Sequence, residues 1–384
     1  MSQYTEMLTD WRRHLHTVPE TGFELTLTPA FVSARLTEMG IEHHTGIGKT
    51  GIVAVIRKGT GTKAIGLRAD MDALNIRETT GLSYASLHEG KMHACGHDGH
   101  TTMLLGAAKL LKEQCEFNGT VYLIFQPDEE NGHGAKAMLD DGLLERFPMT
   151  EIYGAHNMPG MPAGTFATRT GGIMASEDNF IIRIQGRGTH AARPHTGSDP
   201  LVIAAQIIMA LQTIVSRNLD PSLSAVVSCT EIASDGLRNT IPGFVEIKGD
   251  TRSYDPQVQD MLEKRMRALC TSICEMNDAR CEFIYTREFS PTVNTEEHKN
   301  YAVEVARDVF GSEKVSDNTL AMMTSEDFGA FLNKIPGCFF FIGNGTEAEG
   351  KGFKPLHNSG YDFNDDILEC GARYFTQLAC SRLK

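Results

Sequence analysis

The chain has 384 residues, a net charge of −13, 41% hydrophobic residues and 22% charged residues. That length predicts two or three domains, and the ordinary apolar and charged fractions exclude a largely disordered chain. The acidic balance argues against nucleic acid or an anionic membrane as the main partner, because both bind basic surfaces. No apolar run is expected to reach the roughly 18 residues of a membrane span, and the polar N-terminal segment does not resemble a signal peptide.

The nine cysteines are an odd number and are scattered from Cys95 to Cys380 without paired spacing. This distribution does not predict a disulfide framework, and it makes the reducing cytoplasm the expected compartment. Cys95 stands apart from the others because histidines flank it in the sequence.

The first part of the chain alternates helical and strand patterns. The predicted helices are 5–18, 29–39, 100–115 and 133–147, and the predicted strands are 51–59, 63–74, 119–127 and 151–159. Strands that alternate with helices of this length predict βαβ units and a mainly parallel sheet covered on both faces.

The pattern changes between residues 179 and 289. Predicted strands and helices follow there in the order strand 179–188, helix 200–217 with Asp199 as its cap, strands 222–236 and 243–253, helix 256–278 and strand 279–289. This βαββαβ order is a complete α+β unit of ferredoxin-like type. The alternation of helices and strands seen in the first part of the chain then returns, with a helix at 296–310, a strand at 338–345 and a helix at 364–382. We therefore expect an α/β domain of residues 1–178 and 290–384, with an α+β domain inserted at 179–289.

Side chains that bind metals follow several predicted strands. In open α/β sheets, functional groups collect beyond the carboxyl ends of the strands. Such groups are Asp70 and Asp72, the segment HACGHDGH at 93–100, the acidic run 128–130, His156 and His357. One thiol with imidazoles and carboxylates suits Zn²⁺, Mn²⁺, Ni²⁺ or Co²⁺ better than Ca²⁺ or Mg²⁺. Because CxxC pairs are lacking, a catalytic site is expected rather than a structural zinc site.

Six motifs, in order along the chain, resemble the M20 metallopeptidase clan. They are LRADMDAL (67–74), MHACGHDGHT (92–101), FQPDEE (125–130), AHNMP (155–159), GRGTHAARPHTGSDP (186–200) and SEDF (325–328). Within the clan they are similar to the amidohydrolase branch that contains hippurate hydrolases, N-acyl amino acid amidohydrolases and auxin-conjugate hydrolases. The resemblance implies hydrolysis of the amide bond of an N-acyl amino acid, aromatic or aliphatic, to a carboxylic acid and a free amino acid.

The resemblance also implies roles for particular residues. Five residues match the family's ligands of two divalent metal ions: Cys95, His97, Glu130, His156 and His357. The expected ions are Mn²⁺ or Zn²⁺, with Ni²⁺ or Co²⁺ as alternatives. Glu129 matches the general base. His190 matches a histidine that holds the carbonyl oxygen of the substrate, and Asn239 matches a residue associated with substrate binding. The inserted domain resembles the family's lid or dimerisation domain, which implies a homodimer or higher homo-oligomer acting on a small molecule.

This sequence departs from the branch around the base. The branch commonly has QPAEEGxGGA where this chain has QPDEENGHGA (126–135), which adds Asp128, Asn131 and His133. It also commonly has proline after DAL, where this chain has Asn75. The ligands and the base are intact, so the departures bear on the substrate and on the exact surroundings of the metal.

The sequence also allows other functions. A deacetylase of the N-acetyl-diaminopimelate type, or a dipeptidase, fits the same clan. A cysteine hydrolase with Cys95 as nucleophile would leave the strand-end carboxylates unexplained. A noncatalytic metal-binding protein would not need Glu129. Sensitivity to chelators separates the thiol enzyme from the metalloenzyme, and turnover separates both from a binding protein.

Overall fold

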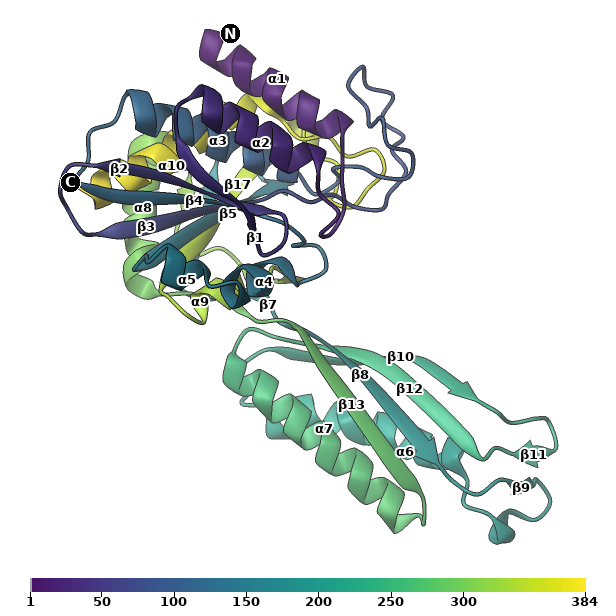
Figure 1. Cartoon of the computed structure of the whole chain (residues 1–384). Coiled ribbons are helices and arrows are strands. Elements are labelled where there is room, and N and C mark those ends of the chain that lie inside the picture. The colour runs from purple at the N-terminus through teal and green to yellow at the C-terminus, as the bar shows by residue number, and fades with distance from the viewer. Residues whose placement is uncertain (1) are drawn as a thin grey trace. The chain divides into compact units, whose positions relative to one another are not determined.

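The computed structural model describes residues 2–384 and contains two compact units (Figure 1). Unit 1 comprises Met1–Ile173, Val293–Leu320 and Asp327–Lys384, and unit 2 comprises Met174–Thr292 and Ala321–Glu326. Unit 2 therefore starts before residue 179 and ends after residue 289, and it includes a short segment from much later in the sequence. That segment contains β16 (Met322–Ser325), which pairs in parallel with β7 (Gly171–Ala175) at Met174 and Ala175.

Unit 1 contains an eight-stranded sheet with the order β1-β2-β4-β3-β5-β17-β6-β15. Its strands are β1 (Glu42–Ile47), β2 (Gly51–Lys58), β3 (Ala64–Asp70), β4 (Gly119–Gln126), β5 (Glu151–Pro159), β6 (Phe166–Ala167), β15 (Val315–Ser316) and β17 (Gly337–Gly345). The four central strands β4, β3, β5 and β17 are parallel, whereas β1, β2 and β6 pair antiparallel with their inner neighbours. The sheet is thus mixed, and the expected parallel arrangement is confined mainly to its centre.

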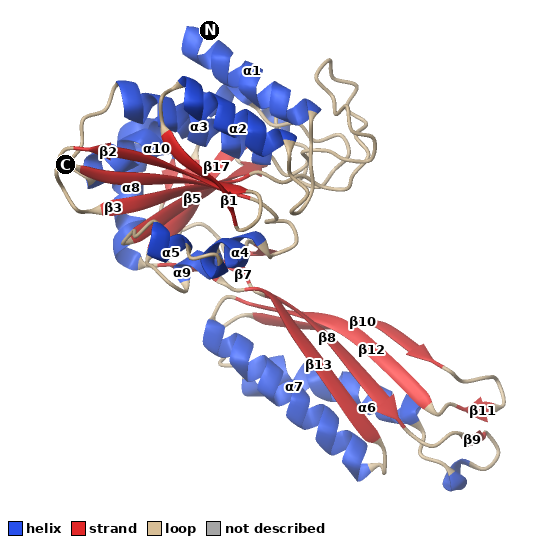
Figure 2. Ribbon diagram, in the orientation of Figure 1, coloured by secondary structure: helices blue, strands red, loops and turns tan. Residues whose placement is uncertain are grey.

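Helices cover both faces of this sheet. They are α1 (Gln3–Thr17), α2 (Leu27–Glu38), α3 (His97–Glu113), α4 (Gly134–Asp140), α5 (Leu143–Arg146), α8 (Glu296–Phe310), α9 (Gly329–Leu332) and α10 (Leu368–Arg382). In Figure 2, α1, α2 and α3 lie above the sheet, and α4, α5 and α9 lie below it, while α10 packs against α3. Every residue of β3 and β4 is buried, which explains the nearly continuous apolar runs of these strands. The helix predicted at 133–147 is two helices, because Gly142 has a φ of 79° between them.

Unit 2 contains a four-stranded antiparallel sheet with the order β10-β12-β8-β13. Its elements are β8 (Glu177–Gln185), α6 (Pro200–Thr213), β10 (Ala225–Ser234), β12 (Phe244–Ser253), α7 (Pro256–Met276) and β13 (Arg280–Phe289). This order and strand arrangement are those of a ferredoxin-like unit, as the sequence predicts. The side chain of Asp199 accepts hydrogen bonds from the N–H groups of Leu201 and Val202, so the expected cap of α6 forms. Two short strands, β9 (Thr189–His190) and β11 (Thr240–Ile241), make a separate ribbon.

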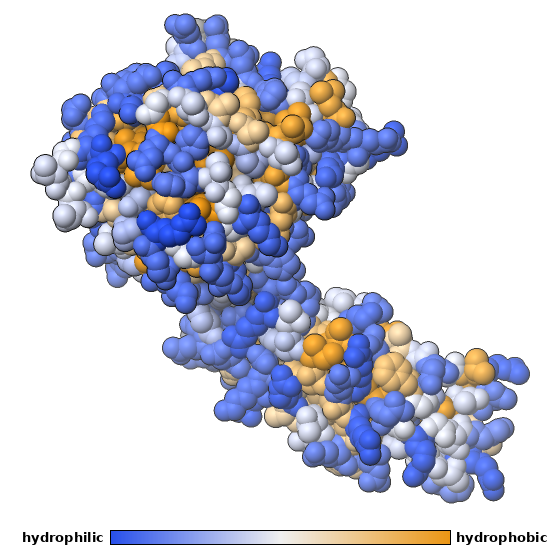
Figure 3. Space-filling view, in the orientation of Figure 1, coloured by the Kyte–Doolittle hydropathy of each residue, from blue (hydrophilic) through white to orange (hydrophobic). Residues whose placement is uncertain are grey.

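The helix that begins at Pro200 corrects one expectation. Residues Pro200–Asn218 form a continuous 19-residue helix, α6 and the turn that follows it, which is long and apolar enough to cross a membrane by length and composition. In the structure one face of this helix, including Ile203, Ile207 and Leu211, lies in the core of unit 2. Hydrophilic side chains predominate on the molecular face drawn in Figure 3, and apolar side chains form scattered patches there.

The cysteines also differ from expectation in one place. Cys115, just after α3, and Cys380, in the last turn of α10, form a disulfide bond, whereas the other seven cysteines are free. The two residues are 265 positions apart, so no local spacing indicates the pair. The bond arises because α3 and α10 pack side by side in the fold.

Candidate metal centre and active site

The five expected ligands of unit 1 come from four segments at one edge of its sheet. Cys95 and His97 lie at the start of α3, Glu130 follows β4, His156 lies in β5, and His357 lies in the long loop after β17. His357 itself has a left-handed backbone with a φ of 61°. The parallel central strands thus deliver these side chains to one place, as the rule for open α/β sheets predicts.

Gly96 permits the tight turn that separates Cys95 from His97. Its φ is 95°, a conformation that favours glycine, and a Cβ at this position would collide with the Asn157 side chain. The turn therefore lets the Cys95 thiol and the His97 imidazole, two positions apart in the sequence, belong to the same group of side chains.

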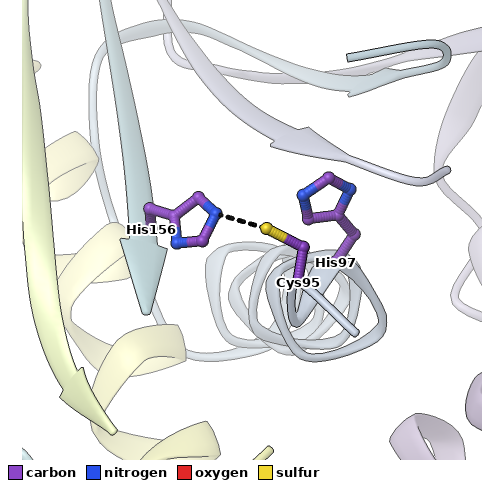
Figure 4. Close-up of side chains that lie close together, drawn as sticks. All are labelled: Cys95, His97 and His156. Atoms are coloured by element: carbon purple, nitrogen blue, oxygen red, sulfur yellow. Dashed lines mark hydrogen bonds between the residues drawn. The ribbon is translucent and has the colours of Figure 1, made fainter. Parts of the chain in front are cut away.

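The ligand atoms form two groups that share the Cys95 sulfur. The first group is Cys95, His97 and His156, and the second is Cys95, Glu130 and His357; within each, the ligand atoms lie within 4.8 Å of one another. Cys95 Sγ lies 3.3 Å from His156 Nε2 (Figure 4), and Glu130 Oε2 lies 3.4 Å from His357 Nε2. The five side chains thus form two groups of candidate ligand atoms that meet at Cys95 Sγ.

The hydrogen bonds of the imidazoles favour metal binding. His97 Nδ1 donates to the carbonyl oxygen of Asp72 at 2.8 Å, and His156 Nδ1 donates to that of Asn157 at 2.7 Å. The Nε2 lone pairs are therefore left to act as ligands, an arrangement usual for metal-bound histidines. Buried polar atoms are nearly always paired, yet neither His97 Nε2 nor Glu130 Oε1 has a hydrogen-bond partner among residues 2–384. The donor set fits divalent cations.

The electrostatics of Cys95 disfavour a thiol nucleophile. Burial, together with the carboxylates of Glu130 and Glu129, raises the pKa of the Cys95 thiol well above its ordinary value. A nucleophilic cysteine needs a lowered pKa, which these neighbours do not provide. Burial likewise raises the pKa of Glu130 to about 7, against the opposing effect of His97. Positive charge at this point would favour the ionised form of both groups, as metal coordination requires.

Glu129 lies beside the ligands without belonging to either of the two groups that share Cys95. Its side chain is buried, with Oε2 3.9 Å from His97 Nε2 and Oε1 accepting a hydrogen bond from the N–H of Asp327 at 3.4 Å. The preceding residue, Asp128, has a φ of 50°, so the chain turns abruptly as it leaves β4. Glu129 and Glu130 are therefore presented to the same cluster in different ways.

Sequence reasoning missed the role of Asp72. Its carboxylate accepts hydrogen bonds from the N–H groups of Glu129 at 3.0 Å and Glu130 at 3.1 Å, while its carbonyl oxygen binds His97. One buried residue thus holds the backbone of two acidic residues and orients one imidazole. The sequence signals for Asp72 were its place after a strand and its place in the LRADMDAL motif.

The three departures near the base lie together. Asp128 Oδ1 accepts a hydrogen bond from Asn131 Nδ2 at 2.5 Å, and Asp128 Oδ2 lies 3.5 Å from His133 Nδ1. Asp128 also packs close to Gly22. These residues therefore form one local network on the turn that carries Glu129.

The two expected site residues of unit 2 are neighbours of each other. His190 in β9 pairs with Thr240 in β11, and the N–H of Ala191 donates to the carbonyl oxygen of Asn239 at 3.0 Å. The side chains of His190 and Asn239 are exposed. The N–H of Ala192 donates to His190 Nδ1 at 3.0 Å, so a neutral His190 carries its proton on Nε2.

Comparison with known proteins identifies the family. The model of Peptidase family M20/M25/M40 matches residues 66–381. The chain is 42% identical over 373 residues to hippurate hydrolase of Campylobacter jejuni, and the match covers 97% of this chain and 96% of that protein. It is 41% identical over 385 residues to N-acetyl-L-cysteine deacetylase of Bacillus subtilis, and this match covers 100% of this chain and 89% of that protein.

A solved structure agrees with these relatives. The YXEP protein of Bacillus subtilis, a dinuclear metal binding peptidase of the M20 family, matches with a TM-score of 0.86 and 32% identity. The match covers 99% of this chain and 98% of that one. The resemblance carried by the six sequence motifs is confirmed, and the chain belongs to the M20/M25/M40 peptidase family as a metal-dependent amidohydrolase.

Proposed function

We propose that this protein hydrolyses the amide bond of N-acyl amino acids with an aromatic or aliphatic acyl group. The products are a carboxylic acid and a free amino acid. The observation that carries the proposal is the buried Glu129 carboxylate beside two ligand groups that share Cys95. The substrate class is supported by the names of two relatives, since hippurate and N-acetyl-L-cysteine are both N-acyl amino acids.

The proposed centre holds two divalent ions, Mn²⁺ or Zn²⁺, with Ni²⁺ or Co²⁺ as alternatives. Cys95 would be shared, with His97 and His156 on one side and Glu130 and His357 on the other. Such ions supply Lewis acidity and lower the pKa of water to about 7. A mixture of thiolate, imidazole and carboxylate suits these metals.

Glu129 is the proposed proton carrier. Its Oε2 faces the ligand cluster, from where it would take the proton of the attacking water and later deliver it to the leaving nitrogen. Because its carboxylate is buried and its backbone is held by Asp72, Glu129 does not need to reorganise for each transfer.

His190 is proposed to hold the carbonyl oxygen of the substrate, with Asn239 binding the substrate beside it. The proton on His190 Nε2 supports this role, because that atom is the one able to donate to an oxygen. Residues 179–289 of unit 2 would act as the lid, so that substrate binding completes the site.

A substitution at His190 tests this part of the proposal. His190→Ala should lower kcat by about 100-fold, the usual loss for one oxyanion donor, with metal content unchanged. His195→Ala is the matched control, because this exposed histidine lies in the same unit. A His190→Ala enzyme with near-normal kcat would mean that the oxyanion is held without His190.

Unit 2 also offers a surface for the proposed homodimer. Strand β10 is an edge strand of its sheet, and edge strands present unpaired backbone groups. On α6, Val202 and Met209 are 53% and 71% exposed although both are large and apolar. Light scattering should give the mass of a dimer or higher oligomer, and Met209→Lys should shift that mass toward the monomer. A single-chain mass for the unaltered protein at working concentration would contradict the homodimer.

The compartment is proposed to be the cytoplasm. Seven free cysteines suit a reducing environment, whereas the Cys115–Cys380 disulfide is unusual there. Counting the reactive thiols of denatured protein from freshly lysed cells distinguishes a reducing compartment from an oxidising one. Nine reactive thiols support the cytoplasm, and seven would indicate an oxidising compartment.

A turnover panel tests the substrate class. Protein loaded separately with Mn²⁺, Zn²⁺, Ni²⁺ or Co²⁺ would be assayed on N-benzoyl, N-acetyl and indole-acetyl amino acids, with N-acetyl-diaminopimelate and free dipeptides as contrast. Fastest turnover of N-acyl amino acids supports the proposal. A clear preference for N-acetyl-diaminopimelate or for dipeptides would instead support the deacetylase or dipeptidase alternative.

A further inference from the structure

A fully buried arginine lies close to the proposed base. Arg68, in β3, donates from Nε to Gln126 Oε1 at 2.8 Å and from Nη1 to Asp70 Oδ2 at 2.8 Å. Its Nη2 donates to Asp327 Oδ1 at 3.0 Å. A buried guanidinium is tolerated only when its charge and its donors are matched in this way. Arg68 is therefore fixed between two carboxylates and one amide.

Asp327 is held from three directions. Besides Arg68, Gln126 Nε2 lies 2.8 Å from each carboxylate oxygen of Asp327, and the N–H of Ala135 donates to Oδ2 at 2.8 Å. Arg68 belongs to β3, Gln126 ends β4 and Ala135 lies in the first turn of α4. Since all three elements are parts of unit 1, the position of Asp327 is set by the scaffold rather than by its own loop.

The backbone of Asp327 contacts the base directly. Its N–H donates to Glu129 Oε1 at 3.4 Å, whereas Glu129 Oε2 lies 3.9 Å from His97 Nε2. Asp72 holds the backbone N–H of Glu129 at 3.0 Å. Asp72 therefore holds the main chain of Glu129, and the main-chain N–H of Asp327 holds one of its carboxylate oxygens.

We propose that Arg68, Gln126 and Asp327 form a positioning device that selects which oxygen of Glu129 transfers the proton. By locking the Asp327 main chain against Oε1, the cluster leaves Oε2 directed at the ligand cluster. Asp327 contacts Glu129, and Arg68 and Gln126 contact Asp327, so each of the three acts through Glu129. The inference rests on the proposed function, because it needs Glu129 to be the proton carrier.

The test is a double-mutant cycle between this cluster and the base. Asp327→Asn keeps the shape of the side chain but removes the charge that faces Arg68. In the unaltered enzyme we expect kcat to fall about 10-fold, with KM within about twofold and metal content unchanged. In the Glu129→Gln background the same substitution should change the residual rate less than about twofold, because no base remains to be positioned.

Two further variants keep the test decisive. If Asp327→Asn does not fold, Arg68→Lys replaces it in the cycle, because lysine retains the charge but loses the planar fork of the guanidinium. Arg68→Lys should likewise lower kcat when Glu129 is present and change the residual rate little in the Glu129→Gln background. Glu151→Gln, which alters a buried ion pair of unit 1 with Arg382, should lower Tm without changing kcat. An equal loss of kcat in both Glu129 backgrounds, or a loss of metal, would overturn the positioning role. Near-normal turnover by Glu129→Gln alone would instead overturn the proposed base.

Discussion

The two ends of strand β5 bury ionisable side chains in opposite ways. At its first residue, Glu151 accepts hydrogen bonds from Arg382 Nε at 2.9 Å and lies 3.1 Å from both Lys63 Nζ and His298 Nε2. This carboxylate is surrounded by cationic or hydrogen-bonding partners, and nothing about it requires a ligand.

The other end of β5 carries His156, one of the candidate metal ligands. There the buried atoms His97 Nε2 and Glu130 Oε1 have no hydrogen-bond partner within the described part of the chain, and they lie 3.8 Å from each other. Because leaving a buried polar atom unpaired costs about 1–3 kcal/mol, such atoms persist where a ligand satisfies them. Burial and charge alone therefore do not mark a site, whereas buried ligand atoms that lack hydrogen bonds and converge on one point do.

Loss of the shared ligand should have the largest effect. Cys95→Ala removes the sulfur common to both ligand groups, so we expect elemental analysis to show strongly reduced metal content and assays to show no measurable turnover. Glu130→Gln should also lose metal. Glu151→Gln is the matched control from the opposite end of β5 and should stay fully loaded. Full occupancy in Cys95→Ala would remove Cys95 from the ligands.

Glu129→Gln separates catalysis from metal binding at the same edge. Glutamine keeps the size and hydrogen bonding of the side chain but does not accept the proton, so kcat should fall by about 10²–10⁴-fold. Metal content and Tm should match those of the unaltered protein. If Glu129→Gln turns over normally while Glu130→Gln is metal-loaded and inactive, the two roles have been assigned the wrong way round.

Asp72 should show an intermediate effect, because it touches the ligands without being one. Asp72→Ala frees the backbone N–H groups of Glu129 and Glu130. Loss of such supporting hydrogen bonds typically costs 10–100-fold in metal affinity or activity. Titration of the metal-free variant with Zn²⁺ or Mn²⁺ measures the change. Unaltered affinity and kcat would show that the ligands are held without Asp72.

The sequence was sufficient to bring the five candidate ligands to one edge of the sheet, because the signals for strand ends and helix starts are local. Each candidate follows a strand pattern or lies at a helix start, and parallel strands bring such positions together. That these side chains bind metal stays a prediction, which the family resemblance supplied. The boundaries of α3, β4 and β5 agree with the sequence patterns within about three residues. The ferredoxin-like order of unit 2 was also readable, because its βαββαβ pattern is contiguous.

The remaining features depend on partners that are distant in sequence. Arg68 and Asp327 are 259 positions apart, and Cys115 and Cys380 are 265 apart, so neither pair leaves a spacing pattern. Strands as short as β6 and β15 exist only because neighbouring strands complete their hydrogen bonds. Such contacts are consequences of the assembled fold and not of local propensity.

The smallest expected effect is on stability, at the Glu151 end of β5. Burial alone would raise the pKa of Glu151, but hydrogen bonds from His298, Arg382 and Lys63 outweigh it and hold the pKa well below its usual value. A carboxyl whose pKa is lowered by folding stabilises the native state above its unfolded pKa of about 4.3. This contribution is lost as the pH falls through the lower pKa of the folded state.

Glu151→Gln should therefore lower Tm by a few degrees at pH 7, because the loss of charged hydrogen bonds costs about 1–3 kcal/mol. The difference in Tm between the two proteins should shrink as the pH falls below about 4, where the unaltered protein loses the same contribution. Metal content and kcat at pH 7 should not change, since no ligand lies at this end of β5. A difference in Tm that stays constant down to pH 3 would show that Glu151 acts through packing rather than through its charge.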